Sequence, residues 1–145
     1  MSMFKVFDVA GSGMAAQSLR LNTTASNLAN ANSVASSPDK AYRAREPLFA
    51  AVHADAMTGQ AGGGDTRDAT VGVQVTGITE SQAPIDRRYE PGNPAADPDG
   101  YVYGSNVNPI DELVNMISAS RSYQNDVEVM QNAKQLMLKT LDLGK

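Results

Sequence analysis

The stretch of sequence from residue 109 to residue 143 decides the fold, and it reads PIDELVNMISASRSYQNDVEVMQNAKQLMLKTLDL. Asn108, directly before it, is a favourable N-cap, and Pro109 suits the first turn of a helix. Asp111 and Glu112 follow at positions where carboxylates complement the positive end of the helix dipole. The stretch therefore predicts one long helix.

Two sides of this predicted helix are apolar. Val114, Val129, Leu136 and Leu143 point roughly away from the main stripe when residues are placed at 100° intervals. Such a stripe normally packs into a core, but a single partner within the chain can cover only one side. Something else must cover the other. The main stripe consists of Leu113, Met116, Ser120, Tyr123, Val127, Met130, Lys134, Met137 and Leu141.

Residues 3–31 predict a second helix, because Phe7, Met14, Leu21 and Leu28 recur every seven residues and form one apolar stripe. Asparagines are unexpectedly frequent towards its end, although the Asn amide competes for backbone hydrogen bonds inside helices. Either they belong to a fraying terminus and its cap, or their amides bond across to neighbouring helices. We favour the first interpretation for Asn32 and the second for Asn27. The asparagines are Asn22, Asn27, Asn30 and Asn32.

The middle of the chain predicts a small β region with loops at 36–39 and 62–64. An extended segment is expected over 42–52, and the strongest strand signal is the alternation of valines from Val71 to Val75. Four prolines between Pro84 and Pro98 exclude a helix or a central strand there. A turn at Asp99-Gly100 then leads into an alternating segment, Tyr101, Val102 and Tyr103.

Composition and motifs argue against an enzyme, a cofactor or a metal. The net charge of −4 is not clustered and the chain has no cysteine, so neither a nucleic-acid surface nor a thiolate site is expected. His53 stands alone, and the glycines at 62–64 lack the Lys-Ser or Lys-Thr of a phosphate loop. If Gly100 is aligned with the invariant glycine of a calcium loop, Ala95 and Asn106 occupy ligand positions that require Asp and Glu. No small-molecule substrate is predicted.

No targeting or membrane segment is expected either. Asp8 interrupts the first apolar run and Gly11 and Gly13 break it further, which matches a cleavable signal peptide poorly. No stretch approaches the length of a membrane span.

Two motifs near the N-terminus resemble the signature of flagellar rod and hook proteins. They are FDVAGSGM at residues 7–14 and ASNLANAN at residues 25–32. Three further motifs are similar to the short C-type subunits of the proximal rod: YEPGNP at 89–94 with DGYV at 99–102, NVN at 106–108, and MISASRSYQ at 116–124. The resemblance covers nearly the whole chain, which is identified as a member of the bacterial flagellar basal-body rod protein family.

The resemblance implies a mainly α fold with a small β region. Residues 1–32 and 105–145 are expected to form one coiled-coil-like axial domain from two paired helices, and residues 33–104 an inserted β-hairpin with an extended proline-rich arm. The expected assembly interface uses apolar residues of both helices. These are Phe4, Phe7, Met14, Leu21, Leu28, Leu113, Met116, Tyr123, Val127, Met130, Met137 and Leu141.

The implied function is that of a structural subunit of the proximal rod, the drive shaft of the flagellar basal body and the wall of its export channel. The expected partners are other proximal and distal rod proteins, further copies of the chain and the flagellar export apparatus, with the surrounding ring proteins as a further candidate. The implied location is the rod where it spans the periplasm, reached by type III export without a cleaved signal peptide. Two alternatives remain at this stage: another short axial rod protein, or a soluble helical adaptor that binds one partner.

Overall fold

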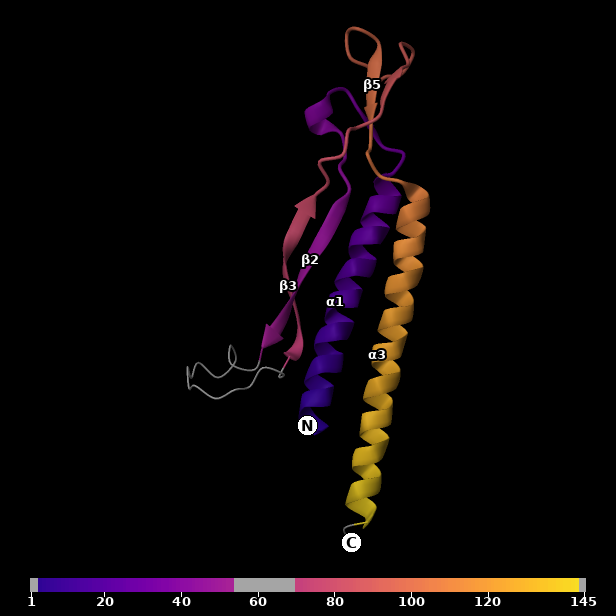
Figure 1. Ribbon diagram of the computed structural model, residues 1–145. Helices are drawn as coiled ribbons and strands as arrows, with labels where there is room; N and C mark the ends of the chain where they lie inside the picture. Colours follow the sequence, from indigo (N-terminus) through magenta and orange to yellow (C-terminus); the bar gives the residue numbers. More distant parts are fainter. Residues whose placement is uncertain (1–2, 54–69, 144–145) are drawn as a thin grey trace. The chain divides into compact units, whose positions relative to one another are not determined.

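The computed structural model describes residues 3–53 and 70–143, and two long helices dominate it (Figure 1). Helix α1 spans Met3–Asn30 and helix α3 spans Pro109–Leu143, which confirms both helices predicted from the sequence. Asn108 caps α3 as expected, since its Oδ1 accepts a hydrogen bond of 3.1 Å from the amide of Ile110.

Among the residues that the structure describes, five strands and one 3-10 turn lie between the helices in the sequence. A three-stranded sheet has the order β1-β5-β4, and a two-stranded sheet pairs β2 with β3. The predicted strands are confirmed, whereas β1 and β4 were not expected, and the predicted loop at 36–39 contains the start of a 3-10 turn. Strand β4 lies among the prolines and is the edge strand that such a position permits. The predicted loop at 62–64 lies outside the described residues. The elements are β1 Val34–Ala35, η1 Pro38–Lys40, β2 Arg45–His53, β3 Thr70–Glu80, β4 Arg87–Tyr89 and β5 Tyr101–Gly104.

The chain divides into two compact units, which are described separately. Unit 1 contains Met1–Leu19, Leu48–Gly77 and Ala119–Lys145, of which the structure describes the residues given above. Unit 2 contains Arg20–Pro47 and Ile78–Ser118. Each unit therefore combines a part of both helices with a part of the β region.

In unit 2, the three-stranded sheet is antiparallel, with Val34 opposite Gly104 and Tyr89 opposite Tyr101. Val102 on the central strand is completely buried. The predicted Asp-Gly turn precedes this strand: Gly100 has a φ of 84°, and a Cβ there would lie 2.9 Å from the ring of Tyr89. Only glycine fits this turn without strain.

In unit 1, strand β3 approaches helix α1 closely at one point. Ser12 Oγ on α1 accepts a hydrogen bond of 3.1 Å from the amide of Val73 and donates one of 2.8 Å to the carbonyl of Val9. Gly72, which is buried, makes this approach possible, because a Cβ built on it would lie only 2.6 Å from Ser12 Oγ. Its φ of 155° is also unfavourable for other residues. Gly72 and Ser12 thus fix β3 against α1.

We expect Gly72→Ala to destabilise unit 1 by about 1–3 kcal/mol, because the added methyl group must push Ser12 away from β3. Gly77→Ala is the matched control, since this glycine lies on the same strand and has open space around its Cβ position. Thermal unfolding of both variants checks the prediction. Equal melting temperatures for the two variants would show that the contact between Ser12 and Gly72 does not hold the strand.

Candidate assembly surface

The buried amide of Asn27 joins α1 to strand β2 within unit 2. The side chain is 1% exposed. Its Oδ1 accepts hydrogen bonds from the Arg45 amide at 2.9 Å and the Tyr42 hydroxyl at 3.1 Å, and its Nδ2 donates to the Arg45 carbonyl at 2.9 Å. The amide also lies close enough to Glu112 on α3 to lower the pKa of that carboxyl, as expected if Asn27 faces a neighbouring helix. The contacts with β2 were not predicted.

A second side-chain amide, that of Asn106, binds Ala44, the residue before Arg45. Its Oδ1 accepts a hydrogen bond of 2.7 Å from the amide of Ala44, and its Nδ2 donates to the carbonyl of Ala83 at 3.0 Å. The Ala44 carbonyl accepts a bond of 2.8 Å from the amide of Ser81. Side-chain amides from α1 and from the segment before α3, together with the Ser81 backbone amide, therefore satisfy the polar backbone groups of the 44–45 segment.

Glu112, in the first turn of α3, is 8% exposed and faces α1. Its Oε2 is buried and has no hydrogen-bond partner among the described residues. Burial raises the pKa of Glu112, the hydrogen bond from Asn27 opposes this shift, and the charges of Glu46 and Asp111 add to it. The sequence suggested only an interaction of Glu112 with the helix dipole, so its buried position was missed.

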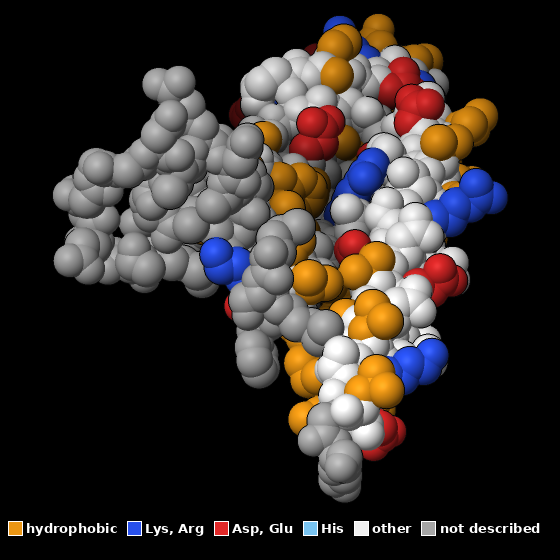
Figure 2. Space-filling model, turned by 60° about the horizontal axis from the view of Figure 1, so that its bottom comes forward, with side chains coloured by type: hydrophobic (Ala, Val, Ile, Leu, Met, Phe, Trp, Pro, Cys, Tyr) orange, Lys and Arg blue, Asp and Glu red, His pale blue; other side chains and the backbone are white. Residues whose placement is uncertain are grey.

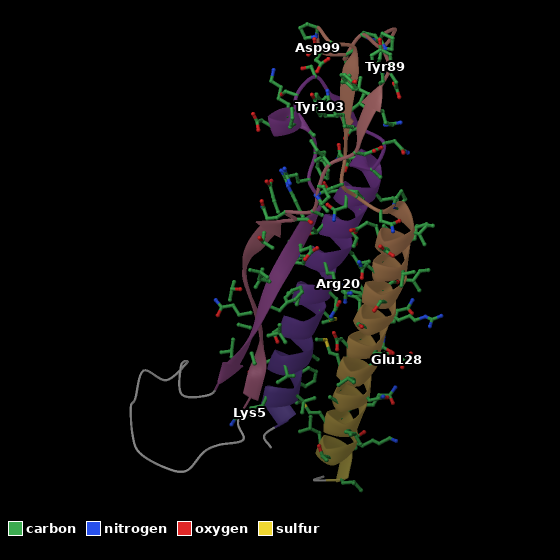
Figure 3. All side chains as sticks on the ribbon, turned by 45° about the horizontal axis from the view of Figure 1, so that its top comes forward. Lys5, Arg20, Tyr89, Asp99, Tyr103 and Glu128 are labelled. Atoms are coloured by element: carbon green, nitrogen blue, oxygen red, sulfur yellow. The ribbon has the colours of Figure 1, made fainter. Side chains whose placement is uncertain are left out.

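Specific contacts join the two helices within each unit. In unit 2, Arg20 on α1, labelled in Figure 3, donates a hydrogen bond of 3.2 Å to Asn115 Oδ1 on α3. In unit 1, Asp126 on α3 lies against Gly13 on α1, where an added Cβ would come within 2.8 Å of Asp126 Oδ2. Because Gly13 has no side chain, the Asp126 carboxylate can lie directly against the α1 backbone.

The inward-facing residues of α3 differ in part from the predicted stripe. Ala119 is completely buried and Ala133 is 7% exposed, and both were missed. They share a seven-residue spacing with Glu112 and Asp126, and this periodicity of small and polar residues is the signal that could have identified them. Alanines on this face are consistent with close packing.

The proposed interface residues occupy two environments in the single chain. Leu113, Tyr123 and Leu141 are exposed, at 47%, 38% and 63%. The side chain of Phe4 lies outside the described part of the structure. The others are partly buried: Phe7, Met14, Leu21, Leu28, Met116, Val127, Met130 and Met137.

The side of α3 that the sequence predicted to need a further partner is open in the structure. Val114, Val129, Leu136 and Leu143 are exposed at 61%, 47%, 57% and 87%. Figure 2 shows hydrophobic side chains at the surface, interspersed with charged ones. No described residue of the chain covers these four side chains enough to bury them.

The β4–β5 segment of unit 2 carries an exposed cluster of aromatic residues and arginine. The Arg87 guanidinium stacks on Tyr101 at 3.7 Å from the ring centroid, and the Tyr89 ring packs edge-on against Tyr101 at 5.2 Å. The hydrogen bond from the Tyr101 amide holds the pKa of Asp97 below its usual range. The carboxylate of Asp97 also accepts bonds from the Asp99 amide and the Tyr103 hydroxyl, so it stabilises this turn.

The described residues contain a hollow lined by polar side chains but no group of side chains suited to hold a metal ion. Over 3–53 and 70–143, no three His, Cys, Asp or Glu side chains lie together as metal ligands. A hollow of about 540 Å³ in unit 2 is lined by Arg88, Asn106 and Asn108 among others. These side chains already pair with Asp86, with Ala83 and with the start of α3. Neither described helix has the combination of length and apolar content needed to cross a membrane.

We expect Glu112→Gln to raise the melting temperature at pH 7 by roughly 2–5 °C, the effect of about 1 kcal/mol in a chain of this size. Because the pKa of Glu112 is raised on folding, its stabilising contribution is complete below its unfolded pKa and is lost as the pH rises through its folded pKa. The gain in melting temperature that Glu112→Gln gives at pH 7 should therefore vanish below pH 4.5, the ordinary pKa of a glutamate.

Glu128→Gln is the control for the melting curves at neutral and acidic pH. Glu128 is exposed on the same helix (Figure 3), so this substitution should change the melting temperature little at either pH. A lower melting temperature for Glu112→Gln at pH 7 would contradict this prediction, because it would show that the ionised carboxylate is stabilised by its surroundings in the folded chain.

Known proteins are similar to this chain along its entire length. Residues 7–35 match the family described as flagella basal body rod protein, and residues 99–143 match the family described as flagellar basal body rod FlgEFG protein C-terminal. The flagellar basal-body rod protein FlgC of Salmonella typhimurium is 50% identical over 145 residues, covering 100% of both chains. The proteins of that name from Escherichia coli O157:H7 and Bacillus subtilis are 49% and 30% identical, again over 100% of both chains.

These relatives are structural rod proteins rather than enzymes. This chain is similar to them over its entire length, and the structure has a long helix near each end of the sequence. The chain belongs to the FlgC family of flagellar basal-body rod proteins and is a structural subunit of the rod.

Proposed function

We propose that this rod subunit forms part of the proximal rod and assembles through its two terminal helices. In this proposal, residues 1–32 and 105–145 form one axial domain in which α1 and α3 pair in a coiled-coil-like manner. The rod built from such subunits is the drive shaft and the wall of the export channel, as the resemblance implies. The residues between 33 and 104 form the inserted β region.

Contacts at regular intervals support the pairing of the helices. Asn27 with Glu112 in unit 2 and Gly13 with Asp126 in unit 1 are separated by 14 residues on each helix, which is two heptads. The buried Ala119 falls midway between Glu112 and Asp126. A spacing of seven residues keeps one face of each helix turned towards the other.

The observation that carries the proposal is the apolar surface that α3 leaves open. Aliphatic residues on its exposed side are each worth about 1.5–3 kcal/mol when fully buried. A soluble monomer gains nothing from them, whereas a subunit surrounded by neighbours in a rod buries them. The residues concerned are Ile110, Leu113, Val114, Ile117, Val129, Leu136, Leu138, Leu141 and Leu143.

The partners proposed for these surfaces are copies of this chain and other proximal and distal rod proteins. The family resemblance further implies export through the flagellar type III apparatus with an uncleaved N-terminus, contact with a surrounding ring and a position where the rod spans the periplasm. An adaptor that binds one partner is the competing function. It would form a complex of fixed composition, whereas rod subunits form a helical array.

Replacing Val127 with Asp is expected to block rod formation. The half-buried Val127 would lose its apolar contacts, and the new carboxylate would be buried without a partner. Because the defect recurs in every subunit, motility and the yield of basal bodies should fall to background.

Glu128→Gln is the matched variant, because Glu128 is the next residue and is exposed; cells carrying it should swim normally. Blots of the envelope fraction must show that both variants reach it. Normal motility with Val127→Asp would show that the apolar stripe of α3 that contains Val127 is not an assembly interface. That result would favour the adaptor.

A further inference from the structure

Three segments of unit 2 meet at the buried amide of Asn27, in a cluster here called the joint. It consists of Asn27 on α1, Tyr42 and Arg45 at the start of β2, and Glu112 in the first turn of α3. A side-chain amide has two N–H donors and an oxygen that accepts two bonds. The oxygen of Asn27 accepts bonds from Arg45 and Tyr42, and one donor binds the Arg45 carbonyl. The second donor remains available to Glu112, whose pKa the Asn27 amide lowers.

The carboxyl group of Glu112 has surroundings that do not suit an anion. The residue is 8% exposed, and its Oε2 has no hydrogen-bond partner among the described residues. The two side chains whose charges act on it, Glu46 on β2 and the preceding Asp111 on α3, are both negative. Burial without partners costs an ionised carboxylate far more than it costs a neutral carboxyl group. The joint therefore accommodates the protonated form of Glu112 better than the ionised form.

The arginines of the surrounding segments are bound elsewhere. Arg20 on α1 donates a hydrogen bond of 3.2 Å to Asn115 Oδ1. The guanidinium of Arg45 on β2 pairs with Glu80 at 3.6 Å. Arg43, in the segment before β2, donates to two backbone carbonyls. Each of these guanidinium groups thus has a partner other than the buried carboxyl group, and none of these contacts neutralises it.

We propose that Glu112 is a proton-controlled switch in the joint. The protonated side chain stays between α1 and α3 beside Asn27. When the proton leaves to water, the ionised side chain turns out into solvent, and the contact between α1 and the start of β2 then opens more often. Asp111, the preceding residue, is exposed, so water is within reach of a rotated Glu112 side chain.

The direction of the pH dependence follows from the surroundings of the carboxyl group. Burial raises the pKa of Glu112, the Asn27 amide opposes this shift, and the charges of Glu46 and Asp111 add to it. A carboxyl group whose pKa is raised on folding stabilises the fold fully below its unfolded pKa, here 4.5. That contribution is lost as the pH rises through the folded pKa. The joint is therefore closed in acid and loosens between pH 4.5 and the higher folded pKa.

Hydrogen exchange of the Arg45 amide tests the switch in the full-length chain, because this amide donates directly to Asn27. Its protection is measured by NMR from about pH 4 to about pH 8, relative to the intrinsic exchange rate at each pH. We expect the protection to fall about threefold or more, with the midpoint at which the Glu112 carboxyl resonance titrates. The amide of Glu90, bound to the Gly100 carbonyl at 2.9 Å in the same unit, is the internal reference and should keep its protection.

Three variants distinguish the switch from a purely structural role of Glu112. Glu112→Gln cannot ionise, so the Arg45 amide should keep its acid protection at every pH. Glu46→Gln removes one negative charge from the surroundings, so the midpoint should move to lower pH; Glu46 is exposed, and the fold should tolerate this change. Glu128→Gln is the control, because Glu128 is exposed and belongs to unit 1, and it should keep the wild-type profile.

A wild-type Arg45 amide without protection, or with protection that does not change with pH, would overturn the switch. So would a Glu112→Gln variant that keeps the wild-type loss of protection, or a Glu46→Gln variant whose midpoint does not fall. Circular dichroism shows whether Glu112→Gln retains its helices. If it does not, the midpoint of Glu46→Gln decides alone, since a structural role of Glu112 would leave that midpoint where it is in the wild type.

Discussion

The constraint on which the structure depends is that α3 carries more apolar surface than the described parts of the chain cover. Contacts such as those of Gly13 with Asp126 and Arg20 with Asn115 place α1 on one side of the helix. Val114 and Leu136 remain open, at 61% and 57%. Burial of apolar surface is the main driving force for folding and association alike. In the assembly proposed above, neighbouring subunits cover this surplus.

The core of the chain is small, so little apolar surface is buried within it. Its buried apolar residues are mostly alanines, and among the described side chains that are under 2% exposed the largest are Val102 and Asn27. Where apolar burial is limited, hydrogen bonds hold the segments in place: Asn27 and Asn106 between them bind Ala44 and Arg45. A buried amide with all its partners specifies one arrangement, because any other would leave polar groups unsatisfied.

The sequence predicted the helices and most strands because their signals are local. Heptad spacing from Phe7 to Leu28 and the Asn108 cap needed no tertiary information. The buried Glu112 could not be recognised, since its environment comes from Asn27 and Glu46 on distant segments. Ala119 was missed because a small residue gives a weak hydrophobic signal, and β4 because prolines flank it. Patterns reveal which helix faces are apolar, but the choice between an intrachain and an assembly contact depends on what α1 covers.

The most direct test of this account is the accessibility of the open side of α3 before and after assembly. The chain has no cysteine, so Val114→Cys and Leu136→Cys each introduce a single thiol. In motile cells carrying either variant, the thiol should react rapidly with a maleimide in the free chain and far more slowly in purified basal bodies, and dissolving the basal bodies should restore the rapid reaction. Equal labelling in the free chain and in intact basal bodies would contradict the claim that assembly covers this surface.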